Sequence, residues 1–186
     1  VIGVHDQPSE IPAAEWNALL ALQAHPTPFL RHEYLQAMHD SGSATARTGW
    51  QPSFMSLRHD GMLVGATLAY LKSHSYGEYV FDWAWADAYQ RHGLAYYPKL
   101  LTAVPFTPVP GSRLLARDEP SRRALLQALK RIAQQLKLSS VHLLFPDAVD
   151  EAAARAEGWL MRNGVQFHWE NRLAGPWRDF ADFLAS

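Results

Sequence analysis

The chain has 186 residues, a formal net charge of -1 and no cysteine. A single domain of this length buries about 70% of the surface that the unfolded chain would expose, so its core needs no disulfide or metal. The lack of cysteine excludes zinc–thiolate sites and a cysteine nucleophile, and the near-neutral charge argues against a DNA-binding surface. No run approaches the roughly 20 apolar residues of a membrane helix, so we expect a soluble protein and assign it to the cytoplasm.

The first third of the chain predicts two helices between extended segments. The expected elements are, in order, a strand at 1–5, helices at 11–22 and 31–40, and strands at 53–59 and 62–72. Asp60 and Gly61 separate the last two strands, and this pair suits the type I′ turn of a hairpin. Gly65 lies inside the second hairpin strand, where a glycine indicates a bulge or a close approach of another backbone.

The middle of the chain, from His74 to Leu115, is dense in aromatic residues, prolines and isolated charges. The expected elements are a strand at 76–83, a short helix at 83–92, a strand at 97–104 and a proline-rich loop at 105–111. In a straight strand Glu78 and Asp82 share a face but lie about 13 Å apart, so they are not expected to form a directly coupled pair. This composition is typical of a shaped pocket, and we expect the functional site here.

The last third predicts two helices, each followed by a strand. The expected elements are a long amphipathic helix after Asp118, a strand at 141–145, a helix at 147–163 interrupted at Gly158, and a strand at 165–172. Asp118 can cap the first of these helices, and Pro120 suits its first turn. His168 lies on the polar face of the final strand, two residues from Glu170.

Residue types alone leave two interpretations of each candidate site residue. Glu78 and Asp82 are either hydrogen-bonded structurally or in contact with substrate, and Tyr97 and Lys99 either line a site or pack. His168 is either a hydrogen-bonded histidine or a ligand-binding one. The same choice, between the core and a ligand platform, applies to the tryptophans Trp83, Trp85 and Trp169. The nine histidines show no HExxH pattern, so we expect no metal site.

Several runs resemble the acetyltransferase fold of the Gcn5-related type. AVPFTPVPG, followed by RRALLQALKRIAQQL and VHLLF, is similar to that fold's central strand, donor loop, helix and next strand. AAARAEGW is similar to its late helix and turn. The resemblance implies a mixed α/β (α+β) domain, with a central, mostly antiparallel, twisted sheet flanked by helices.

A more specific resemblance is to the FemAB-like, predicted N-acyltransferase family, carried by LKSHSYGEYVFDWAWADAY, YYPKLLTAVPFTPVPGSRLL and GVQFHWENR. It implies transfer of an acyl or aminoacyl group to a small-molecule amine, with a bacterial cell-wall (peptidoglycan) precursor as the acceptor. Members are typically about twice this length, so residues 1–173 would form an N-terminal acyltransferase-like domain and 174–186 would lead to a second such half.

This chemistry needs a general base for the amine and groups that line the acceptor. The expected catalytic residues are Glu78, Asp82 and Tyr97. The expected substrate-binding residues are Trp83, Tyr89, Lys99, Phe106, Thr107, Arg113, His168 and Asn171.

The chain departs from the acetyltransferase pattern at the donor loop. The Q/R-x-x-G-x-G/A run that cradles the coenzyme A pyrophosphate is absent, and Asp118 and Glu119 place negative charge at the helix start. Nearby arginines can offset this charge: Arg113, Arg117, Arg122 and Arg123. We therefore expect this half to contribute acceptor binding or a degenerate donor site, and the usual site for the acyl-CoA or aminoacyl donor to lie in the second half. The alternatives are a non-catalytic ligand-binding or structural half-domain on this fold and an unrelated ligand-binding α/β domain.

Overall fold

A computed structural model describes residues 1–80, 82–167 and 175–185 of the chain. The elements are β1 (Ile2–His5), η1 (Pro8–Glu10), α1 (Ala13–Ala21), η2 (Pro28–Leu30), α2 (His32–Asp40), η3 (Ala46–Thr48), β2 (Trp50–Pro52), β3 (Phe54–His59), β4 (Met62–Thr67), β5 (Tyr70–Lys72), α3 (Trp83–Arg91), β6 (Lys99–Thr102), β7 (Leu114–Ala116), α4 (Glu119–Gln135), β8 (Val141–Leu143), α5 (Ala148–Ala156) and α6 (Phe180–Leu184). In the described part of the chain, no helix is long and apolar enough to cross a membrane.

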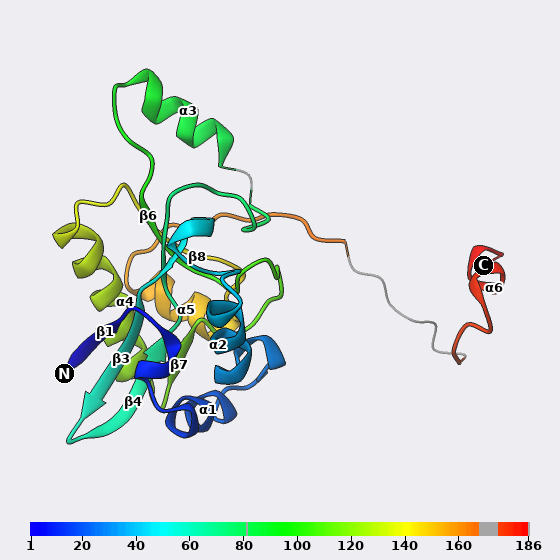
Figure 1. The fold of residues 1–186 in the computed structure, drawn as a ribbon, viewed down its shortest axis with the longest axis horizontal. Coiled ribbons are helices and arrows are strands. Elements are labelled where there is room, and N and C mark those ends of the chain that lie inside the picture. Colours follow the sequence, from blue (N-terminus) through cyan, green and yellow to red (C-terminus); the bar gives the residue numbers. More distant parts are fainter. Residues whose placement is uncertain (81, 168–174, 186) are drawn as a thin grey trace.

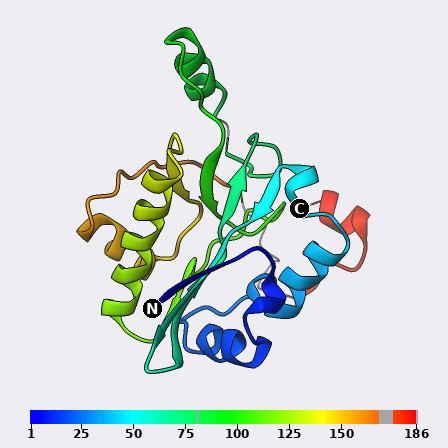
Figure 2. The same ribbon diagram turned by 60° about the vertical axis from the view of Figure 1, so that its left-hand side comes forward.

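The strands form two four-stranded sheets in the orders β1-β3-β4-β7 and β2-β5-β6-β8, and the helices cover both faces (Figures 1 and 2). Every pairing is antiparallel except β6 with β8, which is parallel. Alternate residues of β3 point to opposite faces, so Phe54 packs with α1 and α2 while Met55 packs with α4 and α5. The expected mixed α/β fold with a mostly antiparallel sheet is confirmed.

The hairpin prediction is confirmed in its turn and its irregularity. Asp60 and Gly61 both have positive φ, 48° and 80°, as a type I′ turn requires. The β3–β4 register shifts between Leu57 and Arg58, which places a bulge beside Gly65. A Cβ on Gly65 would lie 3.2 Å from Leu125 of α4, so this glycine also permits the close approach of the helix.

The proline-rich loop separates β6 from β7. β5 and β6 pair with Tyr70 opposite Leu101, whereas β4 and β7 pair with Thr67 opposite Leu114. The chain therefore leaves the sheet that contains β6 after Thr102 and enters the other sheet at Leu114, and residues 103–112 form an excursion between the two. Proline cannot donate to a central ladder, which is why this segment projects from the sheet.

Three strand predictions and one helix prediction need correction. The expected strand at 62–72 is two strands, β4 and β5, which belong to different sheets and are separated by Leu68 and Ala69. The expected strand at 76–83 is a turn that leads into α3, because Gly77 and Tyr79 have positive φ, 79° and 58°, and cannot continue an extended run. Residues 165–167 are not in a strand, and the rest of that predicted strand, with His168, lies outside the described residues. The expected helix at 147–163 ends at Ala156, and Gly158, with φ 75°, turns the chain away.

Candidate active site

A fully buried lysine, Lys99 at the start of β6, lies at the centre of an ionic cluster. Its ammonium donates to Ser75 Oγ at 3.0 Å, to Glu78 Oε2 at 2.8 Å and to Asp82 Oδ2. The expectation that Glu78 and Asp82 lie too far apart to be coupled is wrong. The turn through Gly77 folds the segment back, and both carboxylates reach the same ammonium.

A second buried lysine, Lys72, lies directly opposite Lys99 in the β5–β6 ladder. Its Nζ lies 3.6 Å above the ring of Trp50 and donates to the carbonyl of Tyr76 at 3.3 Å. The pKa of Lys72 is lowered to about 7, chiefly by burial and also by the charge of Lys99, while the charge of Glu78 opposes both effects.

The Lys72 pKa predicts a dependence of stability on pH. Between about pH 7 and pH 10.5 the unfolded chain holds a proton on this lysine that the folded protein lacks, so its contribution to the free energy of unfolding rises with pH. We expect Lys72→Met to remove this rise. Urea denaturation of both proteins at pH 7, 8 and 9 measures it, and parallel pH slopes would contradict the assignment. Lysine ¹³Cε spectra, with only four lysines in the chain, give the pKa directly.

A chain of hydroxyl groups leads from the cluster to the half-buried Tyr97. Ser75 Oγ lies 2.8 Å from the hydroxyl of the half-buried Tyr97, and Tyr96 donates to Asp82 Oδ2 at 3.0 Å. Burial raises the pKa of Glu78 despite the charge of Lys99. Burial opposes ionisation of Asp82 as well, but the hydrogen bonds and charge of Lys99 and the Tyr96 hydroxyl bring its pKa below the usual value.

Two further charged or titratable residues border the cluster. Arg162 reaches Asp82 Oδ1 at 3.2 Å from the extended segment after α5. His142 of β8 lies against the ring of Tyr96, and burial, with the charge of Lys99, lowers its pKa to about 4. The histidine is therefore neutral at physiological pH.

The structure brings some of the predicted site residues together and separates others. Glu78, Asp82, Tyr97 and Lys99 form the cluster, and Tyr89 packs edge-on against Tyr96, with ring centroids 5.2 Å apart. The remaining residues lie elsewhere: Trp83 is 64% exposed beside Tyr76, Phe106 packs on Trp50, Thr107 lies 3.2 Å from the hydroxyl of Tyr34, and His168 and Asn171 lie outside the described residues.

Arg113, predicted to bind substrate, is fully buried and holds the proline loop. Its guanidinium donates to the carbonyls of Val109, Gly111, Ser112 and Leu144. Burial lowers its pKa to about 10. Each of its guanidinium nitrogens is thus engaged with backbone, so this arginine shapes the excursion of residues 103–112.

Sequence reasoning missed Lys72, Ser75, Tyr96, His142 and Arg162. A signal for the first was present, because AYLK and YYPKLL each place one lysine beside apolar strand residues. Charged residues in buried strands are rare unless they are paired. The pairing itself, Lys72 opposite Lys99, depends on the strand register and could not be read from local spacing.

The start of α4 does not fit a coenzyme A pyrophosphate. Asp118 Oδ1 accepts from the amide of Ser121 at 2.8 Å, the amide of Arg122 bonds to the Asp118 carbonyl, and Pro120 has no N–H. A cavity of about 370 Å³ lies here, but Asp118, Glu119 and Asp147 line it together with Arg117 and Arg122. Few free amides and three carboxylates disfavour a phosphate.

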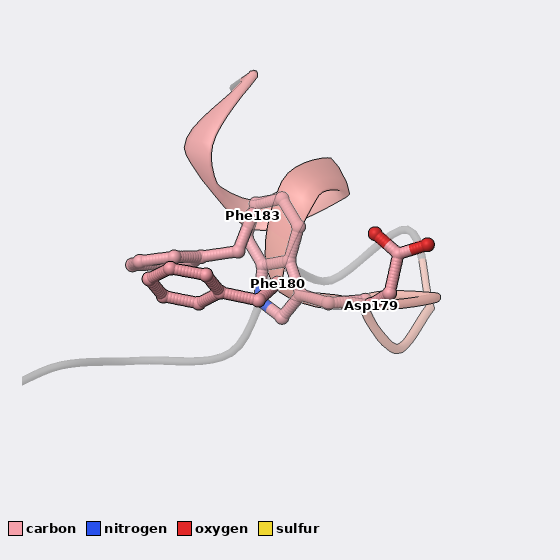
Figure 3. A pocket seen from close by; sticks show the side chains of 4 residues that line it. Asp179, Phe180 and Phe183 are labelled. Atoms are coloured by element: carbon pink, nitrogen blue, oxygen red, sulfur yellow. The ribbon is translucent and has the colours of Figure 1, made fainter.

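A second hollow, of about 510 Å³, is formed by Trp177, Asp179, Phe180 and Phe183 (Figure 3). All four residues come from the segment around α6, which lies apart from the sheets in Figure 1. The hollow therefore takes no part in the lysine cluster. Within the described ranges, no group of three histidine, aspartate or glutamate side chains could hold a metal ion.

Solved structures with this architecture define the class of the fold. A ribosomal-protein-alanine N-acetyltransferase from Brucella melitensis biovar Abortus matches with a TM-score of 0.52 at 16% identity, over 91% of this chain and 99% of that chain. The aminoglycoside N-acetyltransferase AAC(6′)-Iy, solved in complex with CoA, matches with a TM-score of 0.50 at 11% identity, over 92% and 100%. The chain thus has the fold of the Gcn5-related N-acetyltransferases.

The sequence also identifies the family within this fold class. The profile of the FemAB-like family, described as peptidoglycan biosynthesis/recognition, matches residues 7–186, so the chain belongs to the FemAB-like family. A comparison with curated protein sequences found no match. Both the expected fold and the expected family are confirmed.

Proposed function

We propose that this domain is the acceptor-binding part of an N-acyltransferase that transfers an acyl or aminoacyl group to an amine of a cell-wall peptide. The single observation that carries the proposal is the hydrogen-bonded chain from Tyr97 through Ser75 to Lys99 and Glu78. It joins a half-exposed hydroxyl to a buried carboxylate, as proton transfer from a bound amine would need. The family and the fold support the same class of reaction.

The proposed step is acyl transfer by direct attack. The amine nitrogen bonds to the acyl carbon, the bond from that carbon to the leaving oxygen or sulfur breaks, and the amine loses a proton. Tyr97 takes this proton at the surface, and Ser75 and Lys99 connect it to Glu78, whose raised pKa suits a proton acceptor. Asp82 holds Lys99 and Tyr96 in position.

The donor is proposed to bind outside this domain, because the start of α4 does not fit a pyrophosphate. We assign residues 1–173 to the acceptor domain and 174–186 to the connection with a second acyltransferase-like half, in a cytoplasmic protein. A non-catalytic ligand-binding role on the same fold is the second candidate. The complete burial of Lys72 and Lys99 favours it, since buried charges are often structural.

A tyrosine substitution tests the proposal. In the full natural chain, Tyr97→Phe is expected to lower acyl transfer to a muramyl peptide with a free side-chain amine by about 10²-fold to 10⁴-fold, the usual contribution of general acid–base catalysis. Tyr79→Phe, on an exposed residue, is the matched control. Transfer is followed by mass spectrometry with acetyl-CoA or aminoacyl-tRNA as donor. A Tyr97→Phe protein as active as the control would favour the non-catalytic candidate.

A further inference from the structure

All hydrogen-bond partners found for the two buried lysines come from one segment. Lys99 donates to Ser75, Glu78 and Asp82, and Lys72 donates to the carbonyl of Tyr76. These residues belong to a projection from the sheet, residues 73–80 and 82–95, which we call the arm. The sheet supplies the two lysines, one from β5 and one from β6, and the arm supplies the carboxylates that contact Lys99. The lysines also contact aromatic rings, Lys72 that of Trp50 and Lys99 that of Tyr96.

The arm buries few side chains against the rest of the protein. Among its described residues, 73–80 and 82–95, the buried side chains are Glu78 and Asp82. Helix α3 has no buried residue and stands clear of the sheets in Figures 1 and 2, with Trp83 and Trp85 64% and 55% exposed. Apolar anchoring is therefore weak, and polar contacts hold the arm. Besides the lysines, these contacts come from Tyr96, Tyr97 and Arg162 and from the amide of Phe106, which donates to the carbonyl of Gly77 at 3.2 Å.

The two lysines need negatively charged partners, but the arm gives Lys72 and Lys99 an incomplete set of them. Below about pH 7, where Lys72 is protonated, two ammonium groups lie directly opposite each other in a buried ladder and repel, so the protonated pair is stable only beside negative charge. Glu78 Oε1 is buried and has no hydrogen-bond partner among the described residues, and Lys72 has a single long hydrogen bond, to Tyr76. The two lysines thus have incomplete partners on a weakly anchored segment. This arrangement suits a binding site in which another anion can replace the arm carboxylates.

We propose that Lys72 and Lys99 form a binding site for an anionic group, a carboxylate or a phosphate, whose place the arm carboxylates take in this structure. When the arm swings outward, the anion replaces Glu78 and Asp82. The inference goes beyond the proposed function: because Ser75 and Glu78 leave with the arm, the chain from Tyr97 to Glu78 is broken while the anion is bound, so the anion competes with transfer. Binding of the anion requires no acyl transfer.

Neutralising the arm tests the site. Glu78→Gln with Asp82→Asn removes the competing charges, so calorimetry should show inorganic pyrophosphate or succinate binding at least about tenfold more tightly than in the wild type, where the arm carboxylates compete. Adding Lys99→Met to this variant should abolish binding, and chloride at equal ionic strength is the control. Preference for pyrophosphate or for succinate distinguishes phosphate from carboxylate. Equal or weaker binding in the double variant would overturn the proposal.

A second measurement keeps the wild-type arm and decides the question even where the double variant fails to fold. The chain has no cysteine, so Gln90→Cys on α3 and Arg131→Cys on α4 place spin labels on the arm and the body alone. Saturating anion should shift the label distance distribution measured by pulsed electron paramagnetic resonance, and an unchanged distribution would refute arm exchange. The proposed function expects the Glu78→Gln, Asp82→Asn variant to lose transfer while it gains anion binding, so unchanged transfer with anion binding would count against the proposed function alone.

Discussion

Replacing Lys99 with methionine is expected to release the arm while the two sheets stay folded. Removing one partner of a buried ion pair costs about 3–5 kcal/mol when the remaining charge cannot reach water. Glu78 and Asp82 can reach water, because the arm that carries them has no buried apolar residue in its described part. Opening is therefore cheaper than keeping Glu78 unpaired inside, with Asp82 held only by Tyr96 and Arg162.

Lysine footprinting measures this release. Lys72 is fully buried beneath the closed arm, whereas Lys137 at the end of α4 is exposed and serves as an internal reference. If the arm changes from about 1% to about 99% open, acetylation of Lys72 by acetic anhydride should accelerate by about 100-fold relative to Lys137. The Tm should fall by only a few degrees.

Two control variants distinguish release of the arm from a general loss of stability. We call the ionic contacts of Lys99 with Glu78 and Asp82 a latch if they alone keep the arm closed. Lys99→Arg keeps a cation that can bind both carboxylates, so the arm should stay closed. Lys130→Met makes the same chemical change on α4 and should leave Lys72 protected. If Lys99→Met instead unfolds the sheets together with the arm, or leaves Lys72 unreactive, the ionic contacts do not act as a latch.

The parts of the fold that sequence could predict are those with local signals. The hairpin follows from Asp60 and Gly61, whose positive φ values form the turn that their residue types favour. Helix α4 follows from an unbroken apolar stripe with Asp118 at its cap. Neither depends on a residue far away in the chain.

The candidate site depends on contacts that no local pattern contains. Sequence reasoning selected Glu78, Asp82, Tyr97 and Lys99, yet it placed the two carboxylates on a straight strand, because one positive φ at Gly77 decides whether that strand exists. The ion pairs join residues 17 to 21 positions apart. Lys72 enters only through the β5–β6 register.

The largest loss of stability is expected from Asp150→Ala, at a buried carboxylate in α5 that holds two other elements. Asp150 Oδ2 accepts from the amides of Arg113 and Leu114, at 2.5 and 2.9 Å, where the chain enters the other sheet at β7. Its other oxygen lies 3.1 Å from Nε of Arg122 in α4. Alanine would leave two buried N–H groups without their acceptor and a buried guanidinium without its ion-pair partner.

The free energy of unfolding should fall by about 4 kcal/mol, since breaking a buried ion pair alone costs about 3–5 kcal/mol. Urea denaturation followed by circular dichroism measures it. Asp118→Ala, which removes a cap from α4, is the matched control and should cost about 1 kcal/mol. Asp150→Asn keeps an acceptor for both amides and should lie between the two. A loss at Asp150→Ala no larger than that of the control would show that Arg113 and the start of β7 are held by their carbonyl contacts alone.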